Sequence, residues 1–205
     1  HNTYFNEKLR NNKNFKNILN FWDMTHELFD KKNNFINLKK KNLQECDAII
    51  CPSKTVKEDL IEYYKIEESK IFVTYFSSDF EKEYSENKKL DNYILYVGSR
   101  SNYKNFESFI KSFSLCDKLK KNYKLLIFGG ENQNVFGKKI LNKYGIKKEL
   151  FEFVRGSNEK LKNIYKNVRL FVYPSHYEGF GIPLIEAMRL GCPITSSSGG
   201  ALKEI

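Results

Sequence analysis

Short apolar runs of strand length alternate with helical segments along most of this chain. Each run has four or five residues and is followed by a turn rich in Gly, Ser or charge. The predicted strands are Ile18–Trp22, Ala48–Cys51, Ile71–Tyr75, Tyr93–Val97, Lys124–Phe128, Phe151–Val154 and Leu170–Tyr173. The predicted helices are Asn37–Glu45, a segment capped by Ser53, Phe106–Leu119, Lys138–Tyr144 and Glu159–Tyr165. Such alternation predicts an α/β fold with mainly parallel sheets and covered faces.

The chain is long enough for two small α/β domains. Its 205 residues can bury a sizeable core, and residues 77–91 are polar and charged, as in a linker. We therefore predict an amino-terminal domain over residues 1–76 and a carboxyl-terminal domain over residues 92–205. The sequence starts and stops abruptly, and residues 201–205 read as the beginning of a helix. We expect a fragment of a longer protein.

The positive charge is concentrated in the second half. The net charge is +10, and residues 91–205 hold 19 Lys and Arg against 10 Asp and Glu. This excess suits a nucleotide diphosphate, an acidic lipid surface or nucleic acid, although most of the lysines are expected to be solvated surface residues. Because no basic helix or aromatic platform accompanies the charge, we do not expect nucleic-acid binding.

The cysteines indicate neither a metal site nor a disulfide framework. The chain has four, without a CxxC pair or a matching histidine cluster. We expect no metal and a reducing, cytoplasmic location. The basic half leaves peripheral association with the inner face of a membrane open.

The stretch from Tyr173 to Cys192 combines the end of a strand, a glycine-hinged loop and a short helix. Pro174 ends the strand, Pro183 suits the first helical turn, and Gly191 suits the position after the helix. Two carboxylates, eight residues apart, therefore lie after the carboxyl end of one strand, with Glu178 in the loop and Glu186 in the helix.

This stretch suits a ligand with hydroxyl and phosphate groups. Gly179 and Gly181 let the backbone approach a ligand closely, and the N–H groups at the helix start can bind an anion. A carboxylate beside a diphosphate would be repelled, so Glu178 and Glu186 are expected to accept hydrogen bonds from sugar or ribose hydroxyls.

Cationic residues follow two other predicted strands. Arg100 and Lys104 lie in the loop after Val97, and Arg155 follows Val154. Ligands of open α/β sheets bind at the carboxyl ends of the strands, where these loops are expected to meet. Together, the cations and the two glutamates favour a nucleotide-sugar as the ligand.

The order of the motifs resembles one family. Tyr173-Pro-Ser-x-x-Glu178-Gly-Phe-Gly-x-Pro-x-x-Glu186-Ala-Met resembles the E-x7-E signature of the retaining GT-B glycosyltransferases of the group 1, or family 4, type. Residues 94–105 resemble the donor-phosphate loop of that family, residues 47–53 the end of its amino-terminal domain, and residues 23–29 its catalytic loop with a His-Asp motif. The resemblance extends over nearly the whole chain in the correct order.

The resemblance implies a GT-B type fold with two Rossmann-like domains, the first incomplete and the second truncated at its end. The first would hold the acceptor and the second the nucleotide-sugar. The family moves a hexose with retention of configuration, without a metal, and the leaving diphosphate assists deprotonation of the acceptor. We therefore expect no cofactor, a UDP- or GDP-hexose as donor, and a glycan or lipid-linked glycan as acceptor.

The resemblance also assigns roles to residues of this chain. Glu178 would contact the donor sugar and Glu186 the ribose, while Lys104 and Arg100 would stabilise the diphosphate and Asp23 would act from the catalytic loop. The other residues expected at the donor are Gly98, Ser99, Arg155, Gly179, Phe180, Gly181 and Ile182.

The chain departs from the family pattern at two places. Ser99 stands where many members have arginine, with Arg100 one position later. Trp22 stands where the family has the histidine before Asp23, and His26 lies one turn onward. The second departure leaves a non-catalytic nucleotide-sugar-binding module open, and a GT-B nucleotide-sugar epimerase is the other alternative. A purely structural role remains open for several groups: Asp23 or Thr25 can cap the next helix, and Lys104 and Glu186 can be surface residues.

Overall fold

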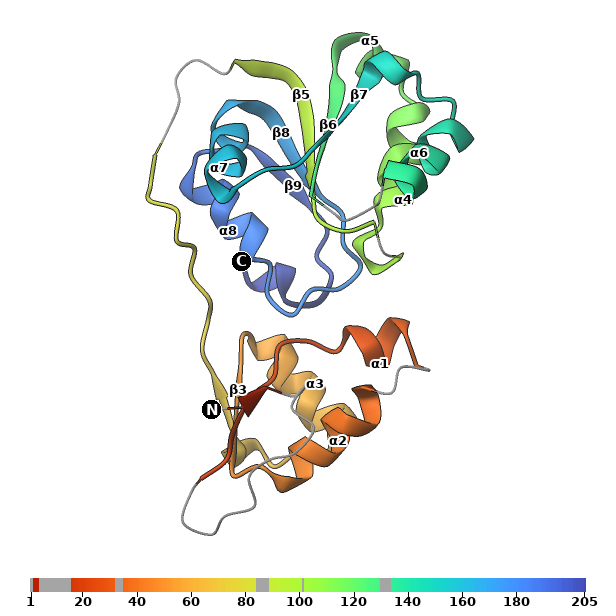
Figure 1. The fold of residues 1–205 in the computed structure, drawn as a ribbon. Helices are drawn as coiled ribbons and strands as arrows, with labels where there is room; N and C mark the ends of the chain where they lie inside the picture. Colours follow the sequence, from red (N-terminus) through yellow and green to blue (C-terminus); the bar gives the residue numbers. More distant parts are fainter. Residues whose placement is uncertain (1, 4–15, 32–34, 84–88, 101, 130–133) are drawn as a thin grey trace. The chain divides into compact units, whose positions relative to one another are not determined.

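The computed structural model describes residues 2–3, 16–31, 35–83, 89–100, 102–129 and 134–205. Its backbone contacts divide the chain into two compact units (Figure 1). The first unit comprises residues 1–76, 177–181 and 198–205, and the second comprises residues 77–176 and 182–197. The domain prediction had placed residues 177–181 and 198–205 with the carboxyl-terminal half, and the domain boundaries stay a prediction.

The first unit is built on a parallel sheet with the strands in chain order. Its strands are β1 (Asn2–Thr3), β2 (Ile18–Asn20), β3 (Ala48–Cys51) and β4 (Ile71–Val73). Its helices are α1 (Thr25–Phe29), α2 (Phe35–Glu45) and α3 (Lys54–Tyr64), with 3-10 turns η1 (Glu68–Lys70) and η4 (Gly200–Glu204). The predicted cap of α3 is confirmed, because the Ser53 hydroxyl accepts a hydrogen bond from the Val56 N–H at 3.1 Å.

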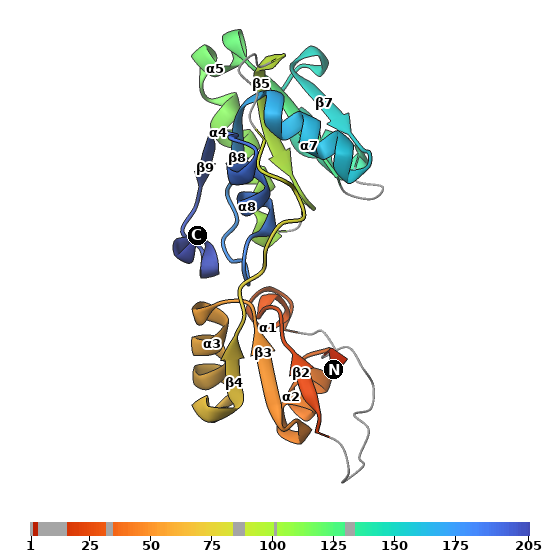
Figure 2. The same ribbon diagram turned by 90° about the vertical axis from the view of Figure 1, so that its left-hand side faces the viewer.

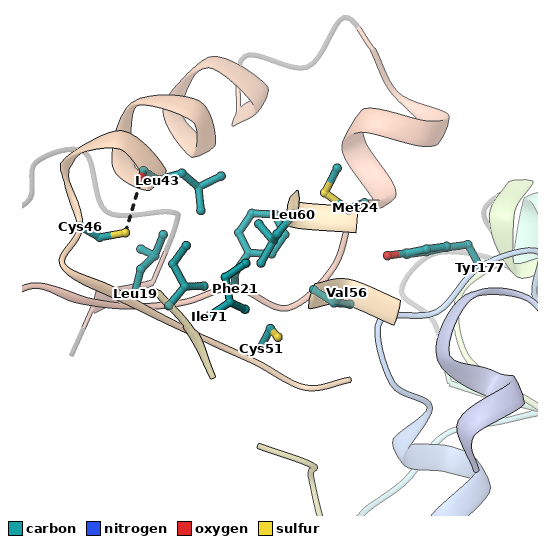
Figure 3. Close-up of a cluster of buried hydrophobic side chains, with 11 residues drawn as sticks. Leu19, Phe21, Met24, Leu43, Cys46, Cys51, Val56, Leu60, Ile71 and Tyr177 are labelled. Carbon is teal, nitrogen blue, oxygen red and sulfur yellow. Dashed lines mark hydrogen bonds between the residues drawn. The ribbon is translucent and has the colours of Figure 1, made fainter. Parts of the chain in front are cut away.

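One face of this sheet packs against the helices. Leu19 and Ile49 are paired across β2 and β3, and both are fully buried. They belong to one cluster with side chains from the other strands, the helices and the loops of this unit: Phe21, Met24, Leu43, Cys46, Cys51, Val56, Leu60, Ile71 and Tyr177 (Figure 3). On the other face, Phe72 of β4 is 56% exposed. The period-two alternation of a strand therefore assigns one face to the core.

The end of the chain returns to the start of α3. The Glu204 carboxylate accepts hydrogen bonds from the backbone N–H groups of Lys54 and Thr55 at 2.9 and 2.7 Å, and from the Thr55 hydroxyl at 2.6 Å. These N–H groups have no partner within the helix, so the carboxylate satisfies them and complements the helix dipole.

The second unit is a doubly wound parallel sheet. Its strands are β5 (Leu90–Val97), β6 (Lys124–Phe128), β7 (Phe151–Val154), β8 (Val168–Tyr173) and β9 (Ile194–Ser196). They lie in the order β7-β6-β5-β8-β9 and are all parallel. The strand order reverses between β5 and β8, and such a switch point is where ligands of open α/β sheets bind.

Helices cover both faces of this sheet. Figure 1 shows α4 (Phe106–Ser114) and α6 (Asn134–Lys143) on one face, and α7 (Asn158–Asn167) and α8 (Ile182–Arg189) on the other. The views in Figures 1 and 2 agree on this arrangement for α4 and α7. Ile94 and Tyr96 of β5 pack with Phe106 and Ile110 of α4, whereas the intervening Leu95 is buried outside this cluster.

The predicted element boundaries differ from the structure in several places. The helix predicted over Phe106–Leu119 ends at Ser114, and α5 (Asp117–Asn122) begins after Cys116. Strand β9 was not predicted, because its three residues after Pro193 are too short for a periodic signal. Two further 3-10 turns, η2 (Asn102–Lys104) and η3 (Lys148–Leu150), precede α4 and β7. Within the described ranges, no helix has both the length and the apolar content to cross a membrane.

Candidate active site

The loops after β5 and β8 are tied together at the switch point of the second unit. The Asn105 amide donates to the Pro174 carbonyl at 3.1 Å, and the His176 N–H donates to the Tyr103 carbonyl at 2.7 Å. Asn105 has φ +56°, a left-handed conformation that asparagine tolerates better than most residues. These contacts fix the predicted phosphate loop against the segment that leads to Glu178.

Lys104 lies at this junction and is partly exposed. Its ammonium donates to the Tyr173 hydroxyl at 3.3 Å and lies 5.4 Å from the centre of the Tyr173 ring. A flexible ammonium at the carboxyl ends of β5 and β8 can reach an anion at the switch point. The predicted phosphate role of Lys104 is compatible with this position and stays a prediction.

Arg100 is more deeply buried than its predicted role suggested. Arg100 is only 4% exposed and donates to the Gly129 carbonyl at 2.6 Å. Its guanidinium carbon lies 5.9 Å from the ring centre of Phe106 and 5.4 Å from that of Phe153. Burial lowers the pKa of the guanidinium, and the charge of Arg155 acts in the same direction. Arg100 therefore joins the loops after β5 and β6 and places positive charge there, while a direct contact with a donor phosphate stays a prediction.

The other predicted donor residues of this unit lie at the same strand ends. Gly98 has φ +126°, and the carbonyl of Ser99 accepts a hydrogen bond from the Tyr96 hydroxyl at 2.6 Å. Arg155 is exposed directly after β7. Three cationic side chains thus follow the ends of β5 and β7, as the sequence predicted.

Glu186 lies on α8 and faces α7. Its carboxylate accepts a hydrogen bond from the buried Tyr165 hydroxyl at 3.3 Å, and Ile182 forms the exposed first residue of the same helix. Burial raises the pKa of Glu186, and the negative charge of Asp79 adds to this effect. A half-buried carboxylate whose partner among the described residues is one hydroxyl at 3.3 Å retains acceptor capacity for a hydroxyl ligand.

In the first unit, Asp23 organises the start of α1. Its carboxylate accepts hydrogen bonds from the N–H of Thr25, at 2.8 Å, and from the Thr25 hydroxyl. The carbonyl of Asp23 accepts a hydrogen bond from the Lys39 ammonium at 3.0 Å. The alternative in which Asp23 or Thr25 caps α1 is wrong, because Met24 is the N-cap of α1 and the described residues place no side-chain cap hydrogen bond on it. The catalytic role of Asp23 stays a prediction.

The glycine-hinged loop packs against Trp22 and Asp23. A Cβ atom added at Gly179 would lie 2.0 Å from the Trp22 carbonyl oxygen and 2.9 Å from the Cβ of Asp23. The buried Ser53 hydroxyl donates to the Gly179 carbonyl at 2.8 Å. Only glycine allows this approach, so the sequence signature fixes a backbone contact in addition to any contact with a ligand.

Further contacts within the first unit hold the same loop. The Ala201 N–H donates to the Glu178 carbonyl at 2.9 Å, and Gly200 has φ +62° directly against that peptide. Glu178 and Gly181 are buried, and the ring of Phe180 lies 5.9 Å from that of Tyr75. The first unit therefore brings together Asp23, Glu178, Gly179, Phe180 and Gly181.

Several residues of this region were not predicted. The Tyr177 hydroxyl donates to Asp59 at 2.6 Å, and Lys39 pairs with Glu27 in the interior of the unit. In the second unit, the Ser175 hydroxyl is buried after β8 without a hydrogen-bond partner among the described residues. Only Lys39 left a signal in the sequence, because Phe35, Lys39 and Leu43 lie at the i, i+4, i+8 spacing of one helix face.

The histidine and cysteine side chains of the described residues form no metal-type cluster. The His26 ring packs 5.7 Å from that of Phe35, and all four cysteines are free. Among the residues that the structure describes, no three His, Cys, Asp or Glu side chains are grouped as a metal site requires.

Residues 77–205 match the family model described as "Glycosyl transferases group 1". The O-antigen chain mannosyltransferase RfbU of Salmonella typhimurium is 30% identical over 178 residues, which cover 86% of this chain and 49% of RfbU. The capsular polysaccharide biosynthesis glycosyltransferase CapM of Staphylococcus aureus is 31% identical over 179 residues, covering 77% of this chain and 45% of CapM. The chain therefore spans about half the length of these curated relatives.

Two solved structures share the fold. WaaG, a glycosyltransferase involved in lipopolysaccharide biosynthesis, matches with a TM-score of 0.74 at 19% identity, covering 92% of this chain and 58% of WaaG. Sucrose-phosphate synthase from Thermosynechococcus elongatus matches with a TM-score of 0.74 at 18% identity, covering 91% of this chain and 51% of that structure. The predicted α/β fold of GT-B type is confirmed.

Proposed function

Because this chain belongs to the group 1 glycosyltransferase family, we propose that the whole protein moves a hexose from a nucleotide-sugar to a glycan during polysaccharide synthesis. The resemblance carried by the E-x7-E signature is thereby confirmed at the level of the family. The reaction class, the sugar and the acceptor belong to the proposal.

The position of Lys104 at the switch point is the observation that carries the proposal. The loop after β5 is hydrogen-bonded to the segment after β8, and the Lys104 ammonium lies at that junction, partly exposed. Arg155 follows β7, and the amino end of α8 follows the same β8 segment. The cations after β5 and β7 and the N–H groups at the start of α8 suit a diphosphate, while Glu186 on α8 suits a ribose hydroxyl.

We propose that charge stabilisation of the leaving diphosphate is the main catalytic effect. Lys104 and Arg155 would lower the energy of the negative charge that develops as the glycosidic bond to the diphosphate breaks. Glu178 would accept hydrogen bonds from the donor sugar, and Asp23 would lie on the acceptor side. Transfer would proceed with retention of configuration and without a metal ion.

Mannose is our candidate for the transferred sugar. RfbU is named an O-antigen chain mannosyltransferase, and Escherichia coli WbdA, 25% identical over 183 residues, is named a serotype-specific mannosyltransferase. TarM of S. aureus, a solved structure with the same fold, is described in complex with UDP. GDP-mannose and UDP-hexoses are therefore the donors to compare.

The test uses the full-length protein. Calorimetry with GDP, UDP, GDP-mannose and UDP-glucose should identify one tight donor, and mass spectrometry should detect sugar transfer to a polysaccharide acceptor. Glu186→Ala should weaken nucleotide binding, whereas Glu178→Ala should abolish transfer and leave nucleotide affinity unchanged. Glu159→Ala, an exposed carboxylate in the first turn of α7, is the matched control. Unchanged affinity in the Glu186 variant would contradict the ribose assignment.

A non-catalytic donor-binding module is the second candidate, favoured by Trp22 in place of the family histidine. Donor binding without transfer or hydrolysis would support it. An epimerase would convert the donor in the absence of any acceptor. A cytoplasmic location with peripheral contact at the inner membrane face stays a prediction that membrane fractionation tests.

A further inference from the structure

A buried ion pair in the first unit contacts the backbone of the Trp22–Asp23 loop. The Lys39 ammonium on α2 lies 3.0 Å from the Glu27 carboxylate on α1, and both side chains are 0% exposed. Removing two charges from water costs free energy, and apolar residues of similar volume are often at least as stable in such places. Fold stability alone therefore does not account for a lysine at this core position.

The ion pair is part of a larger network. Lys39 also donates to the Asp23 carbonyl at 3.0 Å and lies 5.0 Å from the centre of the Phe21 ring. The second carboxylate oxygen of Glu27 accepts a hydrogen bond from the Tyr64 hydroxyl at 2.5 Å. The network thus joins α1, α2 and α3 to the loop between β2 and α1.

The loop held by this network also contacts the glycine hinge. The Trp22 carbonyl lies against Gly179, where an added Cβ would come within 2.0 Å of the oxygen. A shift of the Asp23 peptide would therefore reorient the Asp23 side chain. It would also alter the contact between the Trp22 carbonyl and Gly179 that supports the Glu178 loop.

We propose that Lys39 is a positioning residue, oriented by Glu27 and Tyr64, that fixes the Asp23 carbonyl and thereby the alignment of Asp23 with the Glu178 loop. An apolar residue could fill the same volume, but it could not donate a hydrogen bond to this carbonyl. The catalytic consequence rests on the proposed function, whereas the structural consequence does not.

Four variants of the full-length protein test the proposal. Lys39→Met removes the donor and leaves the Glu27 charge buried. Glu27→Gln/Lys39→Met removes both charges, so it should regain thermal stability while the Asp23 carbonyl still lacks its donor. Tyr64→Phe removes one hydroxyl and retains the ion pair. Lys143→Met, which breaks an exposed pair with Glu107 in the second unit, is the control.

The positioning role predicts a split between kcat and donor affinity. We expect kcat to fall about 10- to 100-fold in the Lys39 variant and in the double variant, because small misplacements of catalytic groups have large effects on rate. Tyr64→Phe should reduce kcat about two- to fivefold, since it weakens the same network. Nucleotide affinity by calorimetry should stay within about twofold of the original in all four variants, and Lys143→Met should also retain kcat.

Trp22 supplies a readout that does not depend on activity. It is the only tryptophan of the 205-residue chain and is 41% exposed, beside Asp23. In the full-length protein, the Trp22 signal is the difference in emission between each variant and the same variant carrying Trp22→Phe. Its emission maximum and its quenching by iodide should change in the Lys39 variant and the double variant, and stay unchanged in Lys143→Met.

The outcomes separate the two proposals. If kcat recovers together with stability in the double variant, or if the Trp22 signal is unchanged in both Lys39 variants, Lys39 has only a structural role and the inference is wrong. If the unmodified protein transfers no sugar from any donor, the proposed function fails, and the Trp22 signal in the stable double variant decides whether Lys39 positions the loop.

Discussion

The two candidate regions are held in opposite ways. In the first unit, Asp23 and Gly179 are held through their backbone, by the Lys39 ammonium and the Ser53 hydroxyl, which are both buried. In the second unit, Lys104 and Glu186 are partly exposed, and each has a hydrogen bond of 3.3 Å to a tyrosine.

The difference leads us to expect different functional effects from the two regions. Backbone contacts made by buried groups give the first unit a fixed shape before any ligand binds, and such preorganisation acts mainly on rate. Side chains with long hydrogen bonds can exchange a tyrosine partner for a phosphate or a hydroxyl, so we expect Glu186 to act on donor affinity and Lys104 to act on both donor affinity and kcat. Substitutions in the two regions should therefore have different effects on stability, kcat and donor binding.

The largest expected effect comes from Gly179→Ala. The new Cβ would overlap the Trp22 carbonyl, so the loop must move away from Asp23. We expect kcat to fall about 100-fold or more, and urea unfolding to show a loss of about 1–3 kcal/mol.

Gly145→Ala is the matched control, because Gly145 has φ +64° and open space around its Cβ position. Its cost should be only the left-handed strain of about 1 kcal/mol, without loss of kcat. If both alanine variants have the same kcat, the proposed coupling between Gly179 and the Asp23 loop is wrong.

Lys104→Met should separate affinity from stability. A charge-assisted contact with a diphosphate is worth about 1.5–3 kcal/mol, so nucleotide affinity should fall roughly 10- to 150-fold while the unfolding curve hardly changes. Calorimetry at two ionic strengths should also show a weaker salt dependence in the variant. Lys120→Met, which breaks an exposed pair with Asp117, should bind nucleotide normally. If both variants bind equally well, Lys104 is a surface residue.

Tyr177→Phe should act on the first unit with a smaller effect. Tyr177 is 6% exposed, and burial together with the Asp59 hydrogen bond raises the pKa of its hydroxyl. Removing the hydroxyl leaves Asp59 without this donor, which should cost about 1–2 kcal/mol of unfolding free energy and a few-fold in kcat. Tyr93→Phe, which breaks a surface bond to Glu152, is the control and should change neither quantity measurably.

The same contrast explains what the sequence could predict. The strands β5 and β7 are short runs of strand length that carry their own signal, and their end loops follow from the topology rule, so the positions of Lys104 and Arg155 were predictable. Strand β9, with three residues, and the break between α4 and α5 have signals too short or too weak to read.

Contacts between distant residues could not be predicted. Tyr177 and Asp59 are separated by 118 positions, and no local pattern pairs them. Arg100 has the same sequence signature whether it binds a phosphate or the Gly129 carbonyl; only the folded structure shows its burial. Lys39 had helical spacing on an apolar face, but its partner Glu27 lies on another helix. Sequence patterns therefore predicted which loops lie at the strand ends better than they predicted how these loops are held.

The smallest expected effect lies in the second unit, outside the site. Hydrogen bonds from Lys162 and Lys166, at 2.5 and 2.6 Å, lower the pKa of Glu83 from 4.5 to about 2. A carboxylate whose folded-state pKa is depressed contributes stability above its unfolded pKa, and loses that contribution as the pH falls through the folded value. Glu83→Gln should therefore lower the melting temperature at pH 7 by no more than about 2 °C, because exposed ion pairs contribute little. The difference between the two proteins should shrink between pH 4.5 and pH 2 and vanish below it. A difference that stays constant over this range would show that the glutamine perturbs packing instead of removing a charge. Glu83 would then not behave like the partly exposed side chains Lys104 and Glu186 of the same unit.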